Sequence, residues 1–248
     1  MIILKTDEEI QQLRAAGRIV AECHAMIAKM IKPGVTTIEI DRLVEEYIRS
    51  KGAIPSFKGH QGFPASICVA RNDVICHGFP DKLPLSEGEV VTIDIGALYH
   101  GYHGDSAWTY AVGKVSQEIE TLMEVCRQSL FQGIEQAVVG NRIGDIGYAI
   151  DTNAKRHRYG NIKEFTGHGV GKDLWEEPAV PHYGNKGTGT RIRQGLVIAI
   201  EPMFTLGDWR AEIDDDGWTA RTIDGSVCVQ YEHTIAITEN GPQILTVL

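Results

Sequence analysis

The chain has little of several features that mark specialised classes of protein. Its 248 residues hold no apolar run close to the ~18 residues that a membrane-spanning helix needs. The opening MIILKTDEEI joins a short apolar patch to several acids, unlike the pattern of a signal peptide. We therefore expect no membrane span, no secretory leader and a cytoplasmic location.

Cysteine and positive charge are also scarce. The five cysteines are odd in number and none has CxxC spacing, which disfavours a disulfide framework and a zinc knuckle. Reduced thiols that act as small buried hydrophobes are the expected alternative. The formal net charge of -9 argues against broad binding to nucleic acid or to an anionic membrane.

What remains is the composition of an ordinary globular protein. Hydrophobic residues make up 43% of the chain and charged residues 23%, and the length suits one large domain or two small ones. Apolar residues at helical spacing predict four helices, and the first two begin at capping boxes. The expected helices cover residues 6–30, 36–51, 116–139 and 143–158.

Strands are expected between these helices and after the last one. Short apolar or alternating runs predict strands over 66–70, 74–77, 90–112 (as a hairpin), 196–201, 218–222 and 226–238. The turn dipeptide Asp224-Gly225 is expected to join the last two. Residues 54–63 and the Pro- and Gly-rich stretch 178–189 are expected to be loops.

The two parts of the chain follow the same order of elements. Each has two helices, a His-Gly pair and then strands that carry acids, which indicates an internal pseudo-repeat. No change of composition marks a linker, so we expect one domain over 1–248 with halves of about 1–113 and 114–248. The residues that correspond are His77 and His168, Asp94 and Glu201, and Asp105 and Glu232.

The predicted hairpin carries two acids close together. Alternating apolar residues set its register around a turn at His100-Gly101 and place Asp105 opposite Gly96. Asp94 then becomes a diagonal neighbour of Asp105 on the same face, with Cα atoms roughly 7–8 Å apart. Such a pair is either two solvated strand acids or half of a site that needs a cation between the carboxylates.

The second half supplies further groups of the same kind. Glu201 and Glu232 each lie on the less apolar side of a predicted strand, and His168 lies among glycines that let the backbone come close to an ion. Four carboxylates and one imidazole would balance two divalent cations, and this donor set suits Mn²⁺, Fe²⁺, Co²⁺ or Mg²⁺, or Zn²⁺. Two metals bridged by water make hydroxide available near neutral pH, so the implied chemistry is metal-assisted hydrolysis.

These motifs resemble those of the bacterial type I methionine aminopeptidases. The resemblance rests on Asp94, the HGD of 103–105, the TGHG around His168, the EP of 201–202 and the QYEHT around Glu232. It implies the α+β pita-bread fold, with pseudo-twofold halves and helices outside a curved antiparallel sheet around a dinuclear metal site. The reaction implied is removal of N-terminal methionine when the second residue is small.

The resemblance also implies roles for single residues. The metal ligands would be Asp94, Asp105, His168, Glu201 and Glu232. Glu201 would also accept and donate a proton, and His77 would contact the scissile amide or the departing group. The substrate pocket would contain Phe63, Cys68, Leu174 and Trp218, with His77 at its edge. A backbone-bound monovalent cation would lie near Asn72, Val74 and Cys228.

Related enzymes of the same fold are disfavoured by chain length. The segments that separate His168, Glu201 and Glu232 leave no room for the helical insertion of the type II enzymes. The cysteine-rich extension of eukaryotic type I enzymes and the extra domain of prolidase and aminopeptidase P are not expected either. The partners expected are a peptide or nascent-chain N-terminus and a transient ribosome contact, and the protein is expected to be a monomer.

One residue departs from the family pattern. Trp175 precedes Glu-Glu-Pro, where the family has a histidine that hydrogen-bonds the substrate carbonyl. An indole donates one hydrogen bond but carries no charge and shuttles no proton. The alternatives are a slow enzyme, one with another specificity, or a metal-binding and peptide-binding protein with vestigial catalysis. Four other histidines have no partner at ligand spacing and are expected at the surface or in the core: His24, His60, His157 and His182.

Overall fold

The computed structural model describes residues 1–248 and contains the four predicted helices. Both capping boxes are present, with Thr6 bonded to Glu9 and Thr36 bonded to Glu39. The first helix ends three residues before its predicted limit, because the chain already turns ahead of Pro33. The helices are α1 (Asp7–Ile27), α2 (Thr37–Ser50), α3 (Gln117–Gln136) and α4 (Ile143–His157), with a short 3₁₀ turn η1 (His60–Gly62).

Fifteen strands accompany the helices. They are β1 (Ile54–Pro55), β2 (Ile67–Arg71), β3 (Val74–Cys76), β4 (Val90–Tyr99), β5 (Tyr102–Ala111), β6 (Gly160–Asn161), β7 (Gly167–Gly169), β8 (Glu176–Val180), β9 (Val197–Ile200), β10 (Met203–Thr205), β11 (Ala211–Ile213), β12 (Ala220–Thr222), β13 (Cys228–Gln230), β14 (His233–Thr238) and β15 (Gly241–Ile244). Antiparallel pairing joins them in the orders β1-β4-β2 with β5 on β4, β13-β10-β6, β11-β12-β3 and β15-β14-β9-β7-β8.

The predicted hairpin is confirmed together with its register. Strands β4 and β5 pair with Gly96 opposite Asp105 and with Asp94 opposite Ala107. The two turn residues His100 and Gly101 have φ of 50° and 83°, the left-handed conformation that two-residue hairpin turns require. The turn therefore fixes which residues of the hairpin share a face with the two acids.

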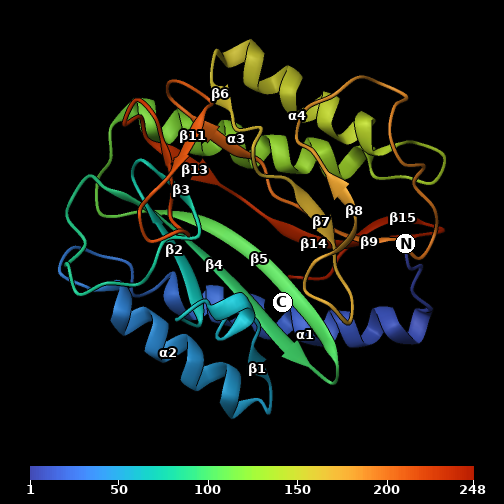
Figure 1. Ribbon diagram of the computed structural model, residues 1–248, viewed down its shortest axis with the longest axis horizontal. Helices are drawn as coiled ribbons and strands as arrows, with labels where there is room; N and C mark the ends of the chain where they lie inside the picture. Colours follow the sequence, from blue (N-terminus) through green and yellow to red (C-terminus); the bar gives the residue numbers. More distant parts are fainter.

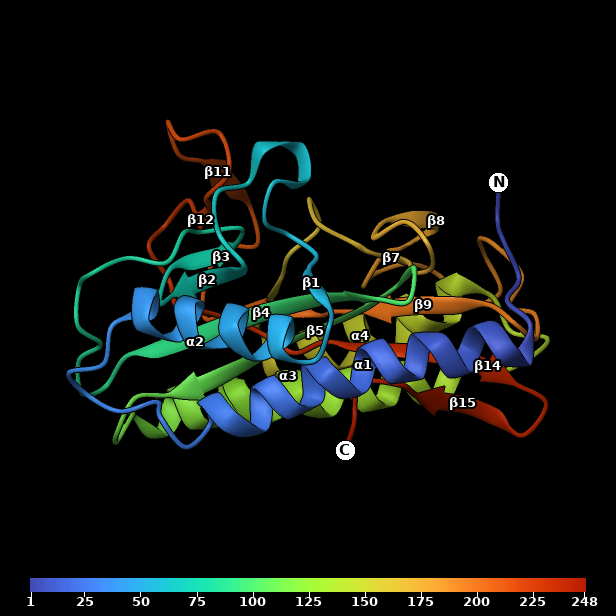
Figure 2. The same cartoon turned by 90° about the horizontal axis from the view of Figure 1, so that it is seen from below.

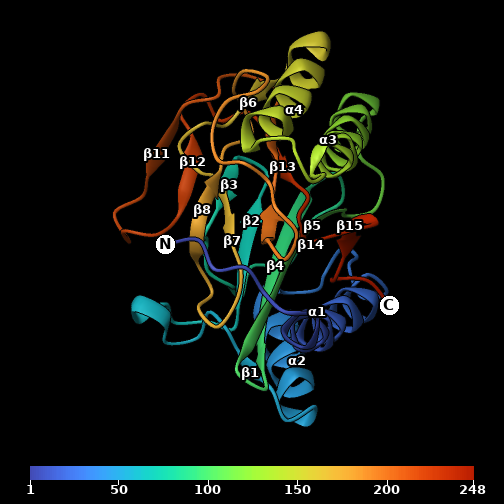
Figure 3. The same cartoon turned by 90° about the vertical axis from the view of Figure 1, so that its right-hand side faces the viewer.

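The helices lie together on one side of the strands. Figures 1 and 3 show α1 and α2 beside the hairpin and α3 and α4 beyond it. Figure 2 shows β3, β11, β12 and η1 on the side away from α1 and α3. Each helix pair packs on its own apolar core: one joins α3 and α4 to β9 and β14, and the other joins α1 and α2 to β2 and β4. The side of the strands opposite the helices is left for the site.

Three expectations about the strands were wrong in part. The run 226–238 is split into β13 and β14, which pair with different strands, β10 and β9. The split occurs where the Glu232 N–H turns to donate to the Ala107 carbonyl at 2.8 Å. Strand β12 pairs with β3 and β11 and not with the strand that follows Asp224-Gly225. The first residues of the expected loop 178–189 belong to β8. Short segments pair according to tertiary partners that local patterns do not encode.

Side-chain hydrogen bonds tie the two halves together beside the acids. Ser106 Oγ donates to the Glu232 carbonyl at 2.7 Å, and Thr234 Oγ1 donates to the Asp105 carbonyl at 2.7 Å. Both bonds are buried, so breaking either one leaves a polar group without a partner.

The half boundaries at about 113 and 114 stay a prediction. None of the helices has the length and apolar composition needed to cross a membrane.

Gly104 in β5 permits the closest approach of the hairpin to α1, which gives a test of the packing. A Cβ added at Gly104 would lie 2.5 Å from the Gly17 nitrogen and 2.6 Å from its Cα. We expect Gly104→Ala to lower the free energy of unfolding by about 1–3 kcal/mol, because backbone atoms must move apart. Denaturant unfolding measures this. The control His100→Asn, at an exposed left-handed position in the turn of the same hairpin, should change stability by less than about 0.5 kcal/mol. Equal losses in both variants would contradict this account.

Candidate active site

A pocket of about 250 Å³ opens among the strands and is lined by all five predicted ligands. Asp94 and Asp105 come from β4 and β5, and His168 comes from β7. Glu201 follows directly after β9, and Glu232 lies between β13 and β14. Residues far apart in the sequence thus meet in one volume.

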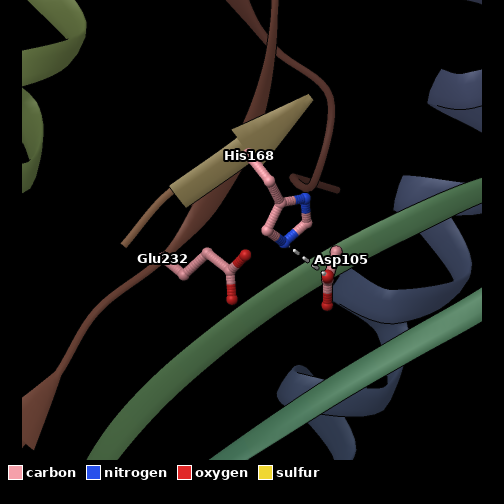
Figure 4. Close-up of side chains that lie close together, drawn as sticks. All are labelled: Asp105, His168 and Glu232. Carbon is pink, nitrogen blue, oxygen red and sulfur yellow. Dashed lines mark ion pairs between the residues drawn. The ribbon is translucent and has the colours of Figure 1, made fainter. Parts of the chain in front are cut away.

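The central side chains point toward one another. One ligand atom each from Asp105, His168 and Glu232 lies within 4.8 Å of the others, and Figure 4 shows these three side chains converging from different segments. His168 Nε2 lies 3.7 Å from Asp105 Oδ2 and 3.6 Å from Glu201 Oε1. These separations leave space for a cation between the donor atoms.

His168 is held in the tautomer that a metal ligand needs. Its Nδ1 lies 2.9 Å from the Gly169 carbonyl, which accepts only, so Nδ1 carries the proton and donates. Burial lowers the pKa of the imidazole to about 4, so the ring is neutral near physiological pH. The unprotonated Nε2 therefore faces the carboxylates with its lone pair.

The four carboxylates are electrostatically unfavourable without a cation. Burial raises the pKa of Asp105 to about 7. Burial, followed by the negative charge of neighbouring carboxylates, raises the pKa values of Asp94, Glu201 and Glu232 well above their usual range. No lysine or arginine lines the pocket. The buried Oδ1 atoms of Asp94 and Asp105 also have no hydrogen-bond partner. An oxygen-rich, negatively charged donor set of this kind fits divalent metal ions.

Two residues that the sequence patterns did not single out hold Glu201. Gln230 Nε2 donates to Glu201 Oε2 at 3.1 Å, and the Glu201 N–H donates to His182 Nε2 at 3.1 Å. His182 is fully buried, which places it in the core, one of the two locations expected for it. The alternation of β13 places Gln230 on the same face as the acid two residues later, and this was the one signal for it in the sequence.

The pocket is apolar at one end. Phe63, Cys68 and Trp218 line it as predicted, and the rings of Phe63 and Trp218 meet edge to face at 5.1 Å. Leu174, also expected there, is buried behind this wall in the cluster that contains Phe63 and Cys68. His77 lines the pocket with φ of 58°, and burial lowers the pKa of its imidazole.

Trp175 lines the same pocket and is 41% exposed. Its ring meets those of His60 and His168 edge to face, at 4.8 Å and 6.3 Å between centroids. His60 also lines the pocket, which corrects its expected place in the core or at the surface. No periodic pattern in the sequence signals this, because the loop that carries His60 has no regular alternation and meets the rest of the pocket only in the folded chain.

The region expected to hold a monovalent cation has a tight backbone arrangement. Asn72 has φ of 50°, and its carbonyl accepts a hydrogen bond from the Cys228 N–H at 2.7 Å. Val74 follows in β3. The cation itself stays a prediction. All five cysteines are free and buried, as expected.

Comparison with known proteins shows the family. The model of metallopeptidase family M24 matches residues 11–239. Methionine aminopeptidase 1 of Bacillus subtilis is 48% identical over 246 residues, which cover 99% of each chain. The chain belongs to the methionine aminopeptidases of family M24.

Solved structures of this family have the same fold. The crystal structures of methionine aminopeptidase from Rickettsia prowazekii and Thermotoga maritima both match with a TM-score of 0.98 over 100% of each chain, at 38% and 41% identity. The predicted α+β pita-bread fold is confirmed. As a metallopeptidase the enzyme uses divalent metal, and as an aminopeptidase it acts on the N-terminus of a peptide or protein.

The raised carboxyl pKa values predict how stability depends on pH and metal. Below about pH 6.5 the raised carboxyl pKa values are opposed by buried histidines whose pKa is lowered to about 4 or about 3: His24, His103, His168, His182 and His233. Above about pH 6.5 these histidines are mostly neutral in both states, and the buried carboxyls, with a pKa of about 7 for Asp105, make the metal-free folded state bind more protons than the unfolded state. The free energy of unfolding of metal-free protein should therefore fall as pH rises from about 6.5 to about 8. Added Mn²⁺ should stabilise the protein more at the upper end, because it binds the deprotonated carboxylates.

Thermal melting in chelator and in Mn²⁺, between about pH 5 and pH 8, measures both effects. Asp94→Asn is the matched variant: it should melt higher than the parent in chelator and gain less from metal, since one buried negative charge is removed. A melting temperature that rises with pH in chelator above about pH 6.5 would count against this picture.

Proposed function

We propose that the chain removes the N-terminal methionine from nascent proteins and peptides whose second residue is small. The observation that carries the proposal is the convergence of four buried carboxylates and one neutral imidazole beside an apolar pocket. Residues 1–248 would act as one metallopeptidase domain. A cytoplasmic location, a monomeric state and a transient ribosome contact belong to the same proposal.

The metal ligands in this proposal are Asp94, Asp105, His168, Glu201 and Glu232, and they would hold two divalent ions. Four carboxylate charges balance two such ions, whereas one ion would leave two buried negative charges without a partner. Mn²⁺, Fe²⁺, Co²⁺ and Zn²⁺ all accept this donor set. When bound, the ions supply an activated water near neutral pH, poised to attack the scissile carbonyl.

Glu201 is proposed to move the proton. Its carboxyl lies beside His168 and receives one hydrogen bond from Gln230. The pocket lining offers Glu201 no lysine or arginine, and a carboxylate within reach of the attacking water is suited to general base catalysis. Glu201 can therefore take a proton from the attacking water and pass it to the departing amine.

His77 and the apolar wall are proposed to position the substrate. The neutral His77 imidazole lies at the pocket edge near Trp218, where it can hydrogen-bond the scissile amide. Phe63, Cys68 and Trp218 form an apolar wall that suits a flexible thioether. Burial raises the pKa of the Cys68 thiol well above its usual range, so this thiol stays protonated and serves as a packing group.

Peptide hydrolysis tests the proposal. Metal-free protein reconstituted with Mn²⁺, Fe²⁺ or Co²⁺ should release methionine from Met-Ala-Ser and should leave X-Pro peptides intact. Glu201→Gln should lower kcat by at least about 10²-fold, because the proton acceptor is lost. Cleavage of X-Pro peptides instead would identify an aminopeptidase of another specificity. Measurable metal binding without any cleavage would identify a peptide-binding homologue.

Trp175→His tests the effect of the departure from the family pattern. An imidazole at this position adds a hydrogen-bonding group that faces the pocket, so kcat/KM on Met-Ala peptides should rise. A missing donor at such a site costs about 10²–10³-fold, which sets the upper limit of the gain. Trp175→Phe is the matched control, since it keeps the aromatic packing without a polar group. An unchanged or lower rate for Trp175→His would contradict this account.

A further inference from the structure

A second imidazole, that of His60, faces the pocket without a hydrogen-bond partner. His60 lines the pocket, and its Nε2 is buried and bonded to no other group of the protein. A buried polar atom without a partner costs roughly 1–3 kcal/mol, and native proteins retain such atoms where they serve a function. The position of this nitrogen in the pocket wall points to a bound ligand as its partner.

The backbone around His60 is built to hold this position. Left-handed residues flank it, with φ of 85° at Gly59 and 48° at Gln61. The His60 N–H donates to the Phe57 carbonyl, and the Phe63 N–H donates to the His60 carbonyl, both at 2.9 Å. The loop is thus anchored to Phe57 and Phe63, which are both buried in the apolar wall of the pocket.

Trp175 orients the ring of His60. The two rings meet edge to face, with centroids 4.8 Å apart and planes at 88°. The centroid of the same indole lies 6.3 Å from that of the His168 ring, so Trp175 packs near both the free imidazole and a member of the proposed ligand set. A peptide extends about 3.3–3.6 Å per residue, so the chain that leaves the scissile bond passes within reach of this wall.

The chemistry of the two side chains assigns the polar role to His60. An indole can only donate, whereas a neutral imidazole donates at one nitrogen and accepts at the other. A peptide backbone presents both carbonyl and N–H groups. The aromatic body of Trp175 serves packing, and the unpartnered Nε2 of His60 is free to bond the backbone of the peptide.

We propose that His60 hydrogen-bonds the backbone of the bound peptide through Nε2 and supplies the polar contact that Trp175 cannot make. In effect, the hydrogen-bonding role of the family's histidine at position 175 is exchanged for aromatic packing by Trp175, and His60 takes over the hydrogen bond. This inference rests on the proposed function, since it requires a peptide in the pocket. It makes His60 a substrate-binding residue that contacts the reacting molecule directly.

A double-mutant cycle tests the exchange of roles, in which His60 makes the hydrogen bond that a histidine at position 175 would make. His60→Phe keeps a ring against Trp175 and removes both nitrogens, and it should lower kcat/KM on Met-Ala-Ser by about 10–100-fold. His60→Gln keeps a donor and an acceptor and should lose less. Trp175→His should raise kcat/KM by a larger factor in the His60→Phe background than in the parent, because the two imidazoles serve the same partner.

Metal content and melting temperature of each variant separate lost binding from lost structure. Both should match the parent in His60→Phe, since His60 is not among the proposed ligands. The same substitution at His157, an exposed residue at the end of α4, is the matched control and should leave kcat/KM unchanged. Binding of Met-Ala-Ser to the Glu201→Gln protein should weaken when His60→Phe is added, which gives a readout independent of turnover.

The outcomes distinguish this inference from the proposed function. If the parent releases methionine and His60→Phe stays within about twofold of it, His60 has no role and the inference fails while the function stands. If His60→Phe loses activity but Trp175→His acts equally in both backgrounds, the exchange is wrong. If the parent cleaves no Met-Ala peptide with any metal, the proposed function fails first.

Discussion

Repulsion among four buried carboxylates is the constraint on which the site depends. Asp94, Asp105, Glu201 and Glu232 share one pocket whose lining contains no lysine or arginine. Like charges in a poorly solvated volume raise one another's pKa, as burial does, and both effects act here. Divalent ions relieve both at once. The arrangement therefore destabilises the metal-free protein and gives the site affinity for divalent metal ions.

The fold counteracts this repulsion by fastening the acid-bearing segments to one another. The backbone beside Glu232 bonds to the backbone beside Asp105 through Ser106, Thr234 and the Ala107 carbonyl. These contacts join residues more than 120 positions apart in the chain. Gly104 adds to the rigidity, since its missing side chain lets α1 lie directly on β5. The proposed metal ligands are thus held close together by the fold itself.

Two walls of the pocket around this centre differ in chemical character. Phe63 and Trp218 form an apolar wall, and Trp175 and His60 form a mixed wall nearer to His168. The first wall suits a thioether side chain, and the second suits the peptide backbone. The departure of Trp175 from the family pattern is best understood together with His60, because the two rings pack as a unit.

Local patterns in the sequence determined the helices, the hairpin with its register, and the order in which the acids and His168 occur. They did so because capping boxes, strand alternation and turn residues act over a few neighbours. Only the tertiary structure decided that the backbone at Glu232 interrupts the expected strand and bonds to the hairpin. It also decided that Leu174 lies behind the pocket wall and that His60 lies in that wall. Each of these depends on contacts between distant segments, which no periodicity within a single segment encodes.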